Sequence, residues 1–169
     1  MQDIVKTVRM HRMRVEDLPG DEKALLERAL LVRNNAQAPY SQYHVGAAVL
    51  SAKETIHVGC NVERCTYTQT THAEQGAIDA MVATLGPTKI EKIAIVGAAR
   101  DVQVSLLNTT EVLENKVCGH CLQIIWENSY QDTQVKLLLL EAHGIALYMT
   151  IGDVFPFCFG PGNLGISVC

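Results

Sequence analysis

The order of hydrophobic patterns along the chain predicts one α/β domain, a three-layer α/β/α sandwich built on a mixed five-stranded sheet. Three observations predict this fold class. Apolar residues recur at helical spacing in three segments, and five short β-rich runs lie between and after these segments. The chain has 169 residues and is 48% hydrophobic, which suffices for one substantial core but not for two.

The first half of the chain predicts a helix followed by a β-hairpin. The helix covers residues 22–35, follows a Pro-Gly break, and has Asp21 available as its N-cap. Two β-rich runs, at residues 45–50 and 55–62, are separated by a short polar turn. This arrangement is typical of a hairpin.

The second half alternates helices and strands. A helical pattern begins at residue 72 and stops at a Gly-Pro pair, after which residues 93–99 form a continuous apolar run. Such a run is typical of a central strand that is covered on both faces. A third helix at residues 118–127 precedes two further strands, at residues 135–140 and 145–150.

Composition excludes several classes of partner. The formal net charge of −4 provides no chain-wide basic field of the kind that binds several phosphates, so we expect no nucleic-acid partner. No apolar run is long enough to span a bilayer, so we expect no membrane partner. Six cysteines are too sparse for a disulfide scaffold and predict reduced thiols and a cytoplasmic location. Four of them are interpreted as ordinary thiols: Cys60, Cys65, Cys158 and Cys169.

The N-terminal residues 1–14 are predicted to be a flexible basic tail, ahead of a single domain at residues 15–169. The basic side chains in the tail are Lys6, Arg9, Arg12 and Arg14. A mitochondrial presequence would share these basic residues, but Asp3 is present and serine is absent from this segment. We therefore favour a solvated tail.

A potential metal centre is the strongest chemical signal in the sequence. Cys118 and Cys121 lie three residues apart at the start of the third predicted helix, so both sulfurs can converge beside its N-terminus. His72 stands at the start of its own helix. One histidine and two cysteines leave a tetrahedral zinc ion with one open position, as in catalytic sites. The Cys-x-x-Cys pair alone would also fit a redox pair, or a closed zinc knot with Cys60 or Cys65 as fourth ligand.

Glu74 adds a proton-transfer group to this centre. It follows His72 by two residues, within the same helical turn. Its carboxylate is placed to take a proton from water on the metal, deliver it to a ring nitrogen and then protonate a departing amine. A first-turn glutamate that only stabilises the helix dipole is the alternative. Together with the three metal ligands, Glu74 favours catalysis.

Several motifs carry a resemblance to a known family. His72-Ala73-Glu74 and Cys118-Gly119-His120-Cys121 resemble the signature of zinc nucleobase deaminases. Residues 38–46, 59–63 and 159–161 look like three further motifs of the free-nucleoside cytidine deaminases, and the resemblance covers residues 21–165.

This resemblance implies a cytidine deaminase-like version of the predicted fold, with one zinc ion per subunit. The implied reaction converts cytidine and 2′-deoxycytidine to uridine and 2′-deoxyuridine plus ammonia, with zinc-bound hydroxide as the attacking group. The implied role is pyrimidine salvage.

The resemblance also implies roles for substrate-binding residues. Asn61 and Glu63 would bind the ribose hydroxyls, and an amide with a carboxylate suits a sugar. Tyr43 would lie against the pyrimidine, and the Ala73 backbone would help to position the base. Phe159, in a Phe-Gly-Pro turn, would cross a subunit interface to close a neighbouring pocket, which implies a homotetramer. Packing of Phe159 within its own subunit is the alternative.

Two positions depart from the family pattern. His72 replaces the cysteine usual in short family members, so the centre has two thiolates and a formally neutral charge, and Gln75 agrees because three-thiolate members place a compensating arginine there. Val117 replaces the proline that usually precedes the first zinc cysteine and constrains the backbone.

Three other functions are open on the residues alone. A relative acting on a modified nucleoside, such as an antibiotic resembling cytidine, would share the metal and proton groups, although Asn61 and Glu63 argue against it. A nucleic-acid editing module is disfavoured by the acidic charge. A structural zinc protein would bind the metal but leave cytidine unchanged.

Overall fold

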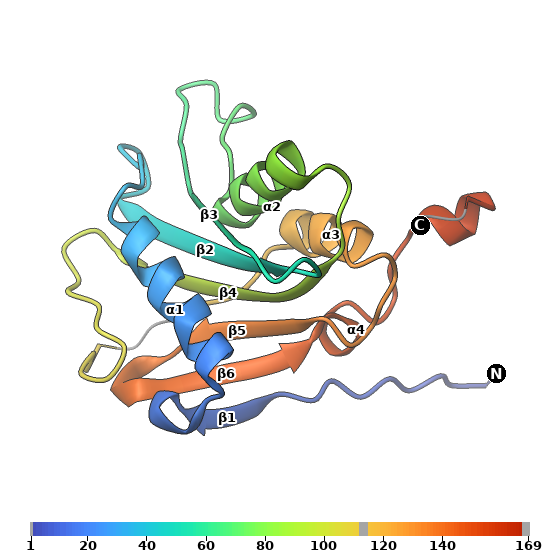
Figure 1. Cartoon of the computed structure of the whole chain (residues 1–169), viewed down its shortest axis with the longest axis horizontal. Coiled ribbons are helices and arrows are strands. Elements are labelled where there is room, and N and C mark those ends of the chain that lie inside the picture. The colour runs from blue at the N-terminus through green and yellow to red at the C-terminus, as the bar shows by residue number, and fades with distance from the viewer. Residues whose placement is uncertain (1, 112–114, 167–169) are drawn as a thin grey trace.

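Six strands form one mixed sheet in the order β1-β6-β5-β4-β2-β3 (Figure 1). The structure is a computed structural model and describes residues 2–111 and 115–166. Only β4 and β5 run parallel to each other; the other neighbouring strands of the described sheet pair antiparallel. The strands are β1 (His11–Arg14), β2 (Tyr43–Ser51), β3 (Ile56–Cys60), β4 (Ile90–Ala99), β5 (Lys136–Leu140) and β6 (Ile145–Thr150).

Helices cover both faces of the sheet and confirm the predicted three-layer architecture. α1 (Gly20–Arg33) packs on one face, while α2 (Ala73–Leu85) and α3 (Gly119–Asn128) pack on the other. No helix in the described ranges has the length and apolar character needed to cross a membrane. The shorter helical segments are η1 (Val15–Asp17), η2 (Ala142–Gly144), α4 (Ile151–Val154) and η3 (Pro161–Leu164).

The central strands supply core residues to both layers. Ile93 and Leu137 join the cluster under α2 and α3, whereas Ala94 and Leu138 join the cluster under α1. Successive side chains of a strand point to opposite faces, so a strand covered on both sides must be apolar at nearly every position. This confirms the interpretation of residues 93–99 as a central strand.

The predicted count of five strands is wrong because the sheet gains β1 at its edge. β1 was assigned to the N-terminal tail, but it pairs antiparallel with β6. The ring of His11 stacks on Tyr148 with centroids 4.9 Å apart, and Arg12 forms an ion pair of 2.7 Å with Glu141. An edge strand tolerates charged side chains. The basic composition of residues 11–14 does not predict a strand, and β1 is recognised only by its pairing with β6.

The start of α1 also differs from expectation. The helix begins at Gly20 with Pro19 as N-cap and without a side-chain capping bond, so the prediction of Asp21 as N-cap is wrong. Asp21 instead accepts a hydrogen bond of 2.7 Å from Lys92 on β4. The Asp21 carboxylate, which the local sequence favours as a helix cap, therefore forms a long-range ion pair with Lys92.

Close packing of α2 on β3 positions the functional site. A Cβ added at Gly59 would come within 2.5 Å of the Ala73 backbone oxygen, so a side chain at this position would displace the helix. Glycine therefore allows the first turn of α2 to lie directly against the sheet.

Candidate active site

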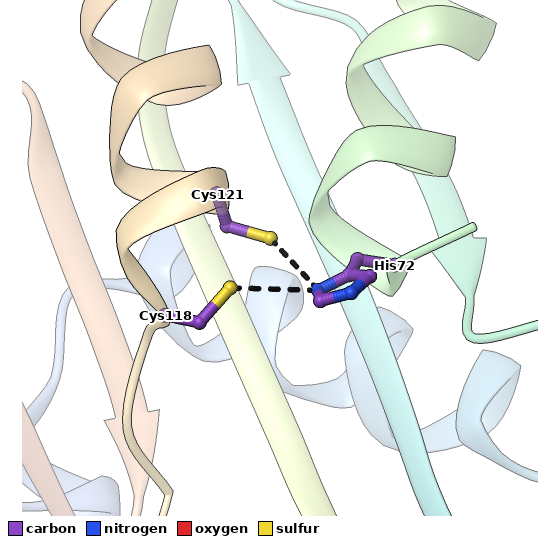
Figure 2. Close-up of side chains that lie close together, drawn as sticks. All are labelled: His72, Cys118 and Cys121. Atoms are coloured by element: carbon purple, nitrogen blue, oxygen red, sulfur yellow. Dashed lines mark hydrogen bonds between the residues drawn. The ribbon is translucent and has the colours of Figure 1, made fainter. Parts of the chain in front are cut away.

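Two helix N-termini deliver the three predicted metal ligands to one place. His72 is the N-cap residue of α2, Cys118 is the N-cap residue of α3, and Cys121 lies in the first turn of α3. The His72 and Cys118 carbonyls accept the first helical hydrogen bonds, from Gly76 and Leu122, at 2.9 Å each. Figure 2 shows the three side chains pointing toward one another across the gap between the helices.

The distances within this cluster fit a zinc ion. His72 Nδ1 lies 3.5 Å from Cys118 Sγ and 3.4 Å from Cys121 Sγ (Figure 2). All three donor atoms lie within 4.8 Å of one another. Tetrahedral zinc, with bonds of about 2.3 Å to sulfur and about 2.0 Å to nitrogen, separates such donors by about 3.5 Å. One imidazole nitrogen and two sulfurs are also ligands that zinc prefers.

Cys121 is the buried member of the cluster. Burial, and after it the nearby Glu74 carboxylate, raise the pKa of the Cys121 thiol. A bound cation acts in the opposite direction, because a metal deprotonates a thiol that coordinates it. Metal binding at this cluster is therefore coupled to the release of a proton.

A cavity of about 320 Å³ opens beside the metal cluster. This volume lies in the range of small-molecule sites. Seven of the nine predicted site residues line it, whereas Cys121 and Phe159 do not. The lining residues are Tyr43, Val45, Asn61, Glu63, Thr70, His72, Ala73, Glu74, Ile95, Asn115, Lys116 and Cys118.

Glu74 combines deep burial with access to the cavity. It lies in the first turn of α2, its residue is 6% exposed, and it lines the cavity together with His72 and Cys118. Its neighbour Gln75 contacts the His120 ring nitrogen Nε2 at 3.5 Å. Two of the three potential metal ligands, His72 and Cys118, and the buried carboxylate therefore line the same cavity.

Asn61 fastens the start of β2 to the cavity wall. Its Oδ1 accepts a hydrogen bond of 2.8 Å from the Val45 backbone, and its Nδ2 donates one of 2.9 Å to the Tyr43 carbonyl. The amide thereby fixes the backbone of Tyr43, the aromatic residue predicted to contact a base. Sequence analysis did not predict this bracing role.

Glu63 braces the preceding loop in a similar way. Its carboxylate accepts hydrogen bonds from the backbone of Tyr40 at 2.8 Å and of Ser41 at 3.2 Å. Burial alone would raise the pKa of Glu63, but the hydrogen bonds from Ser41 and Tyr40 outweigh burial and hold its pKa below the ordinary value. A carboxylate offers about four acceptor positions, so acceptor capacity is left for a ligand hydroxyl.

The predicted Phe-Gly-Pro motif lies away from the cavity of its own chain. It belongs to the C-terminal segment, which extends away from the sheet in Figure 1. Phe159 is 59% exposed, and its carbonyl accepts a hydrogen bond of 3.0 Å from Gln123 on α3. The structure of one chain therefore does not bring Phe159 to the other site residues.

Two cavity residues that sequence analysis missed come from the segment before Cys118. Asn115 is buried and Lys116 is exposed. This segment carries no periodic pattern, so only its proximity to the cysteine motif could have drawn attention to it. Three other cysteines of the described residues, Cys60, Cys65 and Cys158, are free thiols and take no part in the cluster, and Cys169 lies outside the described residues.

Three potential zinc ligands with a buried carboxylate beside them, on an α/β/α sandwich, are the arrangement expected of a zinc-dependent hydrolase of the deaminase class. A family model described as the cytidine and deoxycytidylate deaminase zinc-binding region matches residues 19–137. The chain belongs to this cytidine and deoxycytidylate deaminase family.

Relatives and solved structures agree with this assignment. A cytidine deaminase of Sporosarcina psychrophila is 29% identical over 147 residues, covering 87% of this chain and 97% of the relative. That of Mycobacterium tuberculosis strain H37Rv is 30% identical over 129 residues, covering 76% and 82%. The crystal structure of cytidine deaminase from Burkholderia pseudomallei is similar with a TM-score of 0.64 and 31% identity, over 80% of this chain and 97% of that chain.

Proposed function

We propose that this chain catalyses the hydrolytic deamination of cytidine and 2′-deoxycytidine to uridine and 2′-deoxyuridine, with release of ammonia. The observation that carries the proposal is that potential metal ligands, a buried carboxylate and side chains suited to bind a sugar all line one cavity of about 320 Å³. Metal ligands and the Glu74 carboxylate line one part, and the sugar-type ligands Asn61 and Glu63 line another. Relatives at 29 and 30% identity bear the name cytidine deaminase, which supports the choice of substrate.

We assign the zinc ligands to His72, Cys118 and Cys121, with one ion per subunit. Their mutual distances of 3.4 and 3.5 Å between nitrogen and sulfur support this assignment. When bound, zinc supplies water of strongly lowered pKa at its fourth position. Two thiolates and a neutral imidazole leave the centre without net charge, in agreement with Gln75 rather than a cation beside it.

Glu74 is assigned the proton transfers. In this proposal its carboxylate accepts a proton from the hydrolytic water and donates it to the pyrimidine ring nitrogen. It then accepts the proton of the hydroxyl added to the ring carbon and passes it to the departing amine, which leaves as ammonia while the carbonyl forms. A carboxyl group serves both steps because it alternates between acceptor and donor. Burial of Glu74 keeps bulk water from competing for the same proton.

Four residues are assigned to the substrate. Tyr43 lies against the pyrimidine, and the Ala73 backbone positions the base. Glu63 accepts hydrogen bonds from the ribose hydroxyls, whereas the Asn61 amide can both donate to them and accept from them. Their support is the shared cavity and the bonds by which Asn61 and Glu63 hold the backbone of residues 40–45.

The wider setting of the enzyme is also a proposal. We place residues 15–169 in one deaminase domain that works as a homotetramer, in which Phe159 reaches a neighbouring cavity. The 59% exposure of this aromatic side chain supports an intermolecular role. Turnover of free nucleosides points to pyrimidine salvage, and the five free thiols among the described residues are consistent with a cytoplasmic protein.

The test is an ultraviolet assay of cytidine turnover on protein of measured zinc content, with Glu74→Gln and the matched control Asp79→Asn. Asp79 is an exposed acid on the same helix. Glu74→Gln is expected to lower kcat by about 10²- to 10⁴-fold while zinc stays bound, and Asp79→Asn to keep the wild-type rate. A wild-type chain that holds zinc but leaves the cytidine absorbance unchanged would contradict the function. An undiminished rate in Glu74→Gln would contradict the mechanism.

A further inference from the structure

Asn115 occupies the place where the parallel pairing of β4 and β5 ends. The register of the two strands runs to the pair Ile95 and Leu139. Beyond it, Asn115 Oδ1 accepts a hydrogen bond of 2.7 Å from the Gly97 backbone, and Asn115 Nδ2 donates one of 2.6 Å to the Leu140 carbonyl. The side-chain amide thus replaces a backbone rung between two central strands.

Both bonds lie in the interior, where their loss leaves polar groups unpaired. Asn115 is 8% exposed, and Gly97 belongs to a strand buried on both faces. A leucine of similar size would fill the space, but it would leave the Gly97 N–H and the Leu140 carbonyl without partners. An aspartate would still accept from Gly97 but could not donate to Leu140 when ionised.

Asn115 also stands three residues before the zinc ligand Cys118. The intervening residues have no regular secondary structure, and Val117 stands where the family resemblance places a proline. Proline would restrict the backbone leading into α3. In this chain the two hydrogen bonds of the Asn115 side chain connect the segment 115–118 to β4 and β5.

Asn115 also lines the cavity. A Cβ added at Gly97 would lie 2.7 Å from Asn115 Oδ1 and 2.9 Å from Tyr43 Cε1, so the three residues pack in direct contact. Displacement of Asn115 would therefore disturb both the segment that leads to Cys118 and the packing of Gly97 beside Tyr43.

We infer that Asn115 is a positioning residue, whose amide holds the segment 115–118 on the sheet and so fixes the Cys118 sulfur for zinc, in place of a proline at position 117. This inference rests on the proposed ligand role of His72, Cys118 and Cys121. It does not depend on which substrate the enzyme converts.

The experiment measures the rate of zinc release from the purified holoenzyme to a colorimetric chelator, alongside thermal unfolding. Asn115→Leu is expected to speed zinc release by about 10- to 100-fold, because loss of a residue that orients a metal ligand typically weakens metal affinity by that factor and we expect the loss to appear in the release rate. Asn128→Ala is the matched control. The Asn128 side-chain amide also donates a partly buried hydrogen bond, 2.9 Å to the Ile124 carbonyl, but this bond lies within α3 and outside the segment 115–118. Asn128→Ala should release zinc at the wild-type rate.

Two further substitutions, Asn115→Asp and Val117→Pro, separate positioning from general destabilisation. Asn115→Asp keeps the acceptor for Gly97 and should show an intermediate release rate, also if Asn115→Leu fails to fold. Adding Val117→Pro to Asn115→Leu or Asn115→Asp should slow zinc release again without restoring the unfolding temperature. Wild-type release in the Asn115 variants, or equal acceleration in Asn128→Ala, overturns the inference. Because zinc release is read without substrate, failure of cytidine turnover would not affect this result.

Discussion

Glu63 shows at the residue scale how one side chain can both build a cavity and face its ligand. Its carboxylate holds the backbone of Tyr40 and Ser41, and it also lines the cavity with Asn61. The hydrogen bonds from this loop keep its pKa below the ordinary value. The residue is therefore ionised at neutral pH, which strengthens its bonds to any hydroxyl.

Glu63→Gln keeps the size of the side chain but removes its charge. We expect the KM for cytidine to rise about tenfold, corresponding to about 1.4 kcal/mol, because neutral acceptors form weaker hydrogen bonds than carboxylates. Steady-state kinetics check this, with exposed Glu54→Gln as control. An unchanged KM in Glu63→Gln would remove Glu63 from the substrate site.

At the scale of elements, a buried carboxylate and two partly exposed lysines attach α1 to the sheet. Glu22 on α1 is 3% exposed and accepts hydrogen bonds of 2.8 Å from both Lys92 on β4 and Lys136 on β5. Burial alone would raise the pKa of Glu22, but the two lysines outweigh burial and lower it. The ion cluster therefore favours the folded state as long as the carboxylate is ionised.

Glu22→Gln should lower the free energy of unfolding by about 2 kcal/mol at pH 7, because it replaces two charge-assisted bonds by weaker ones. Urea unfolding measures this loss. The control is Glu16, which forms an ion pair with Arg14 and whose side chain is 54% exposed. Glu16→Gln should change the free energy of unfolding by less than about 0.5 kcal/mol. Equal losses in both variants would show that burial of Glu22 contributes nothing.

The pH dependence of this contribution has a definite sign. The folded pKa of Glu22 is lowered, so its stabilisation is complete above the unfolded carboxyl pKa of about 4.3 and is lost as pH falls through the lower folded pKa. Wild type and Glu22→Gln should therefore converge in stability on acidification below that range. Divergence on acidification would contradict the assigned shift.

At the scale of the whole molecule, the C-terminal segment exposes two large aromatic side chains in a single chain. Phe157 and Phe159 are 96% and 59% exposed, and the segment extends away from the sheet (Figure 1). Such aromatic exposure is typical of surfaces that contact another chain. The proposed tetramer would cover this segment and bring Phe159 into a neighbouring site.

Complementation between inactive subunits tests this arrangement. Phe159→Ala should lower kcat/KM by about tenfold or more, because an aromatic anchor at the neighbouring cavity is lost. Mixed oligomers of Phe159→Ala and Glu74→Gln subunits should then recover activity, since Glu74→Gln subunits supply Phe159 to intact catalytic groups. Phe157→Ala serves as control from the same segment. Sedimentation at the mass of one chain, or mixtures no more active than their parts, would contradict the shared site.

The metal centre was predictable because its ligands belong to local motifs. His72 and the pair Cys118 and Cys121 each lie at the start of a helix, and helix periodicity alone brings the two cysteines to one side. The resemblance to deaminases added Asn61 and Glu63, and the cavity contains both. The central strands were equally clear, because burial on two faces requires continuous apolar sequence.

Other features depend on residues far apart in the chain. β1 is a strand because it pairs with β6. Asp21 accepts a hydrogen bond from Lys92 instead of capping α1. Asn115 was overlooked because its partners, Gly97 and Leu140, lie 18 and 25 residues away along the chain.

The sequence by itself therefore determined the layered α/β architecture of this deaminase and predicted which residues would form its proposed metal centre and proton-transfer group. Residues close together in sequence, such as His72 and Glu74 or Cys118 and Cys121, are predictable because the local geometry of a helix follows from a few backbone dihedrals. Only the tertiary structure decided the sixth strand, the ion cluster that attaches α1 and the bracing of the cavity by Asn61, Glu63 and Asn115. These depend on hydrogen bonds between distant segments, which no periodic pattern encodes.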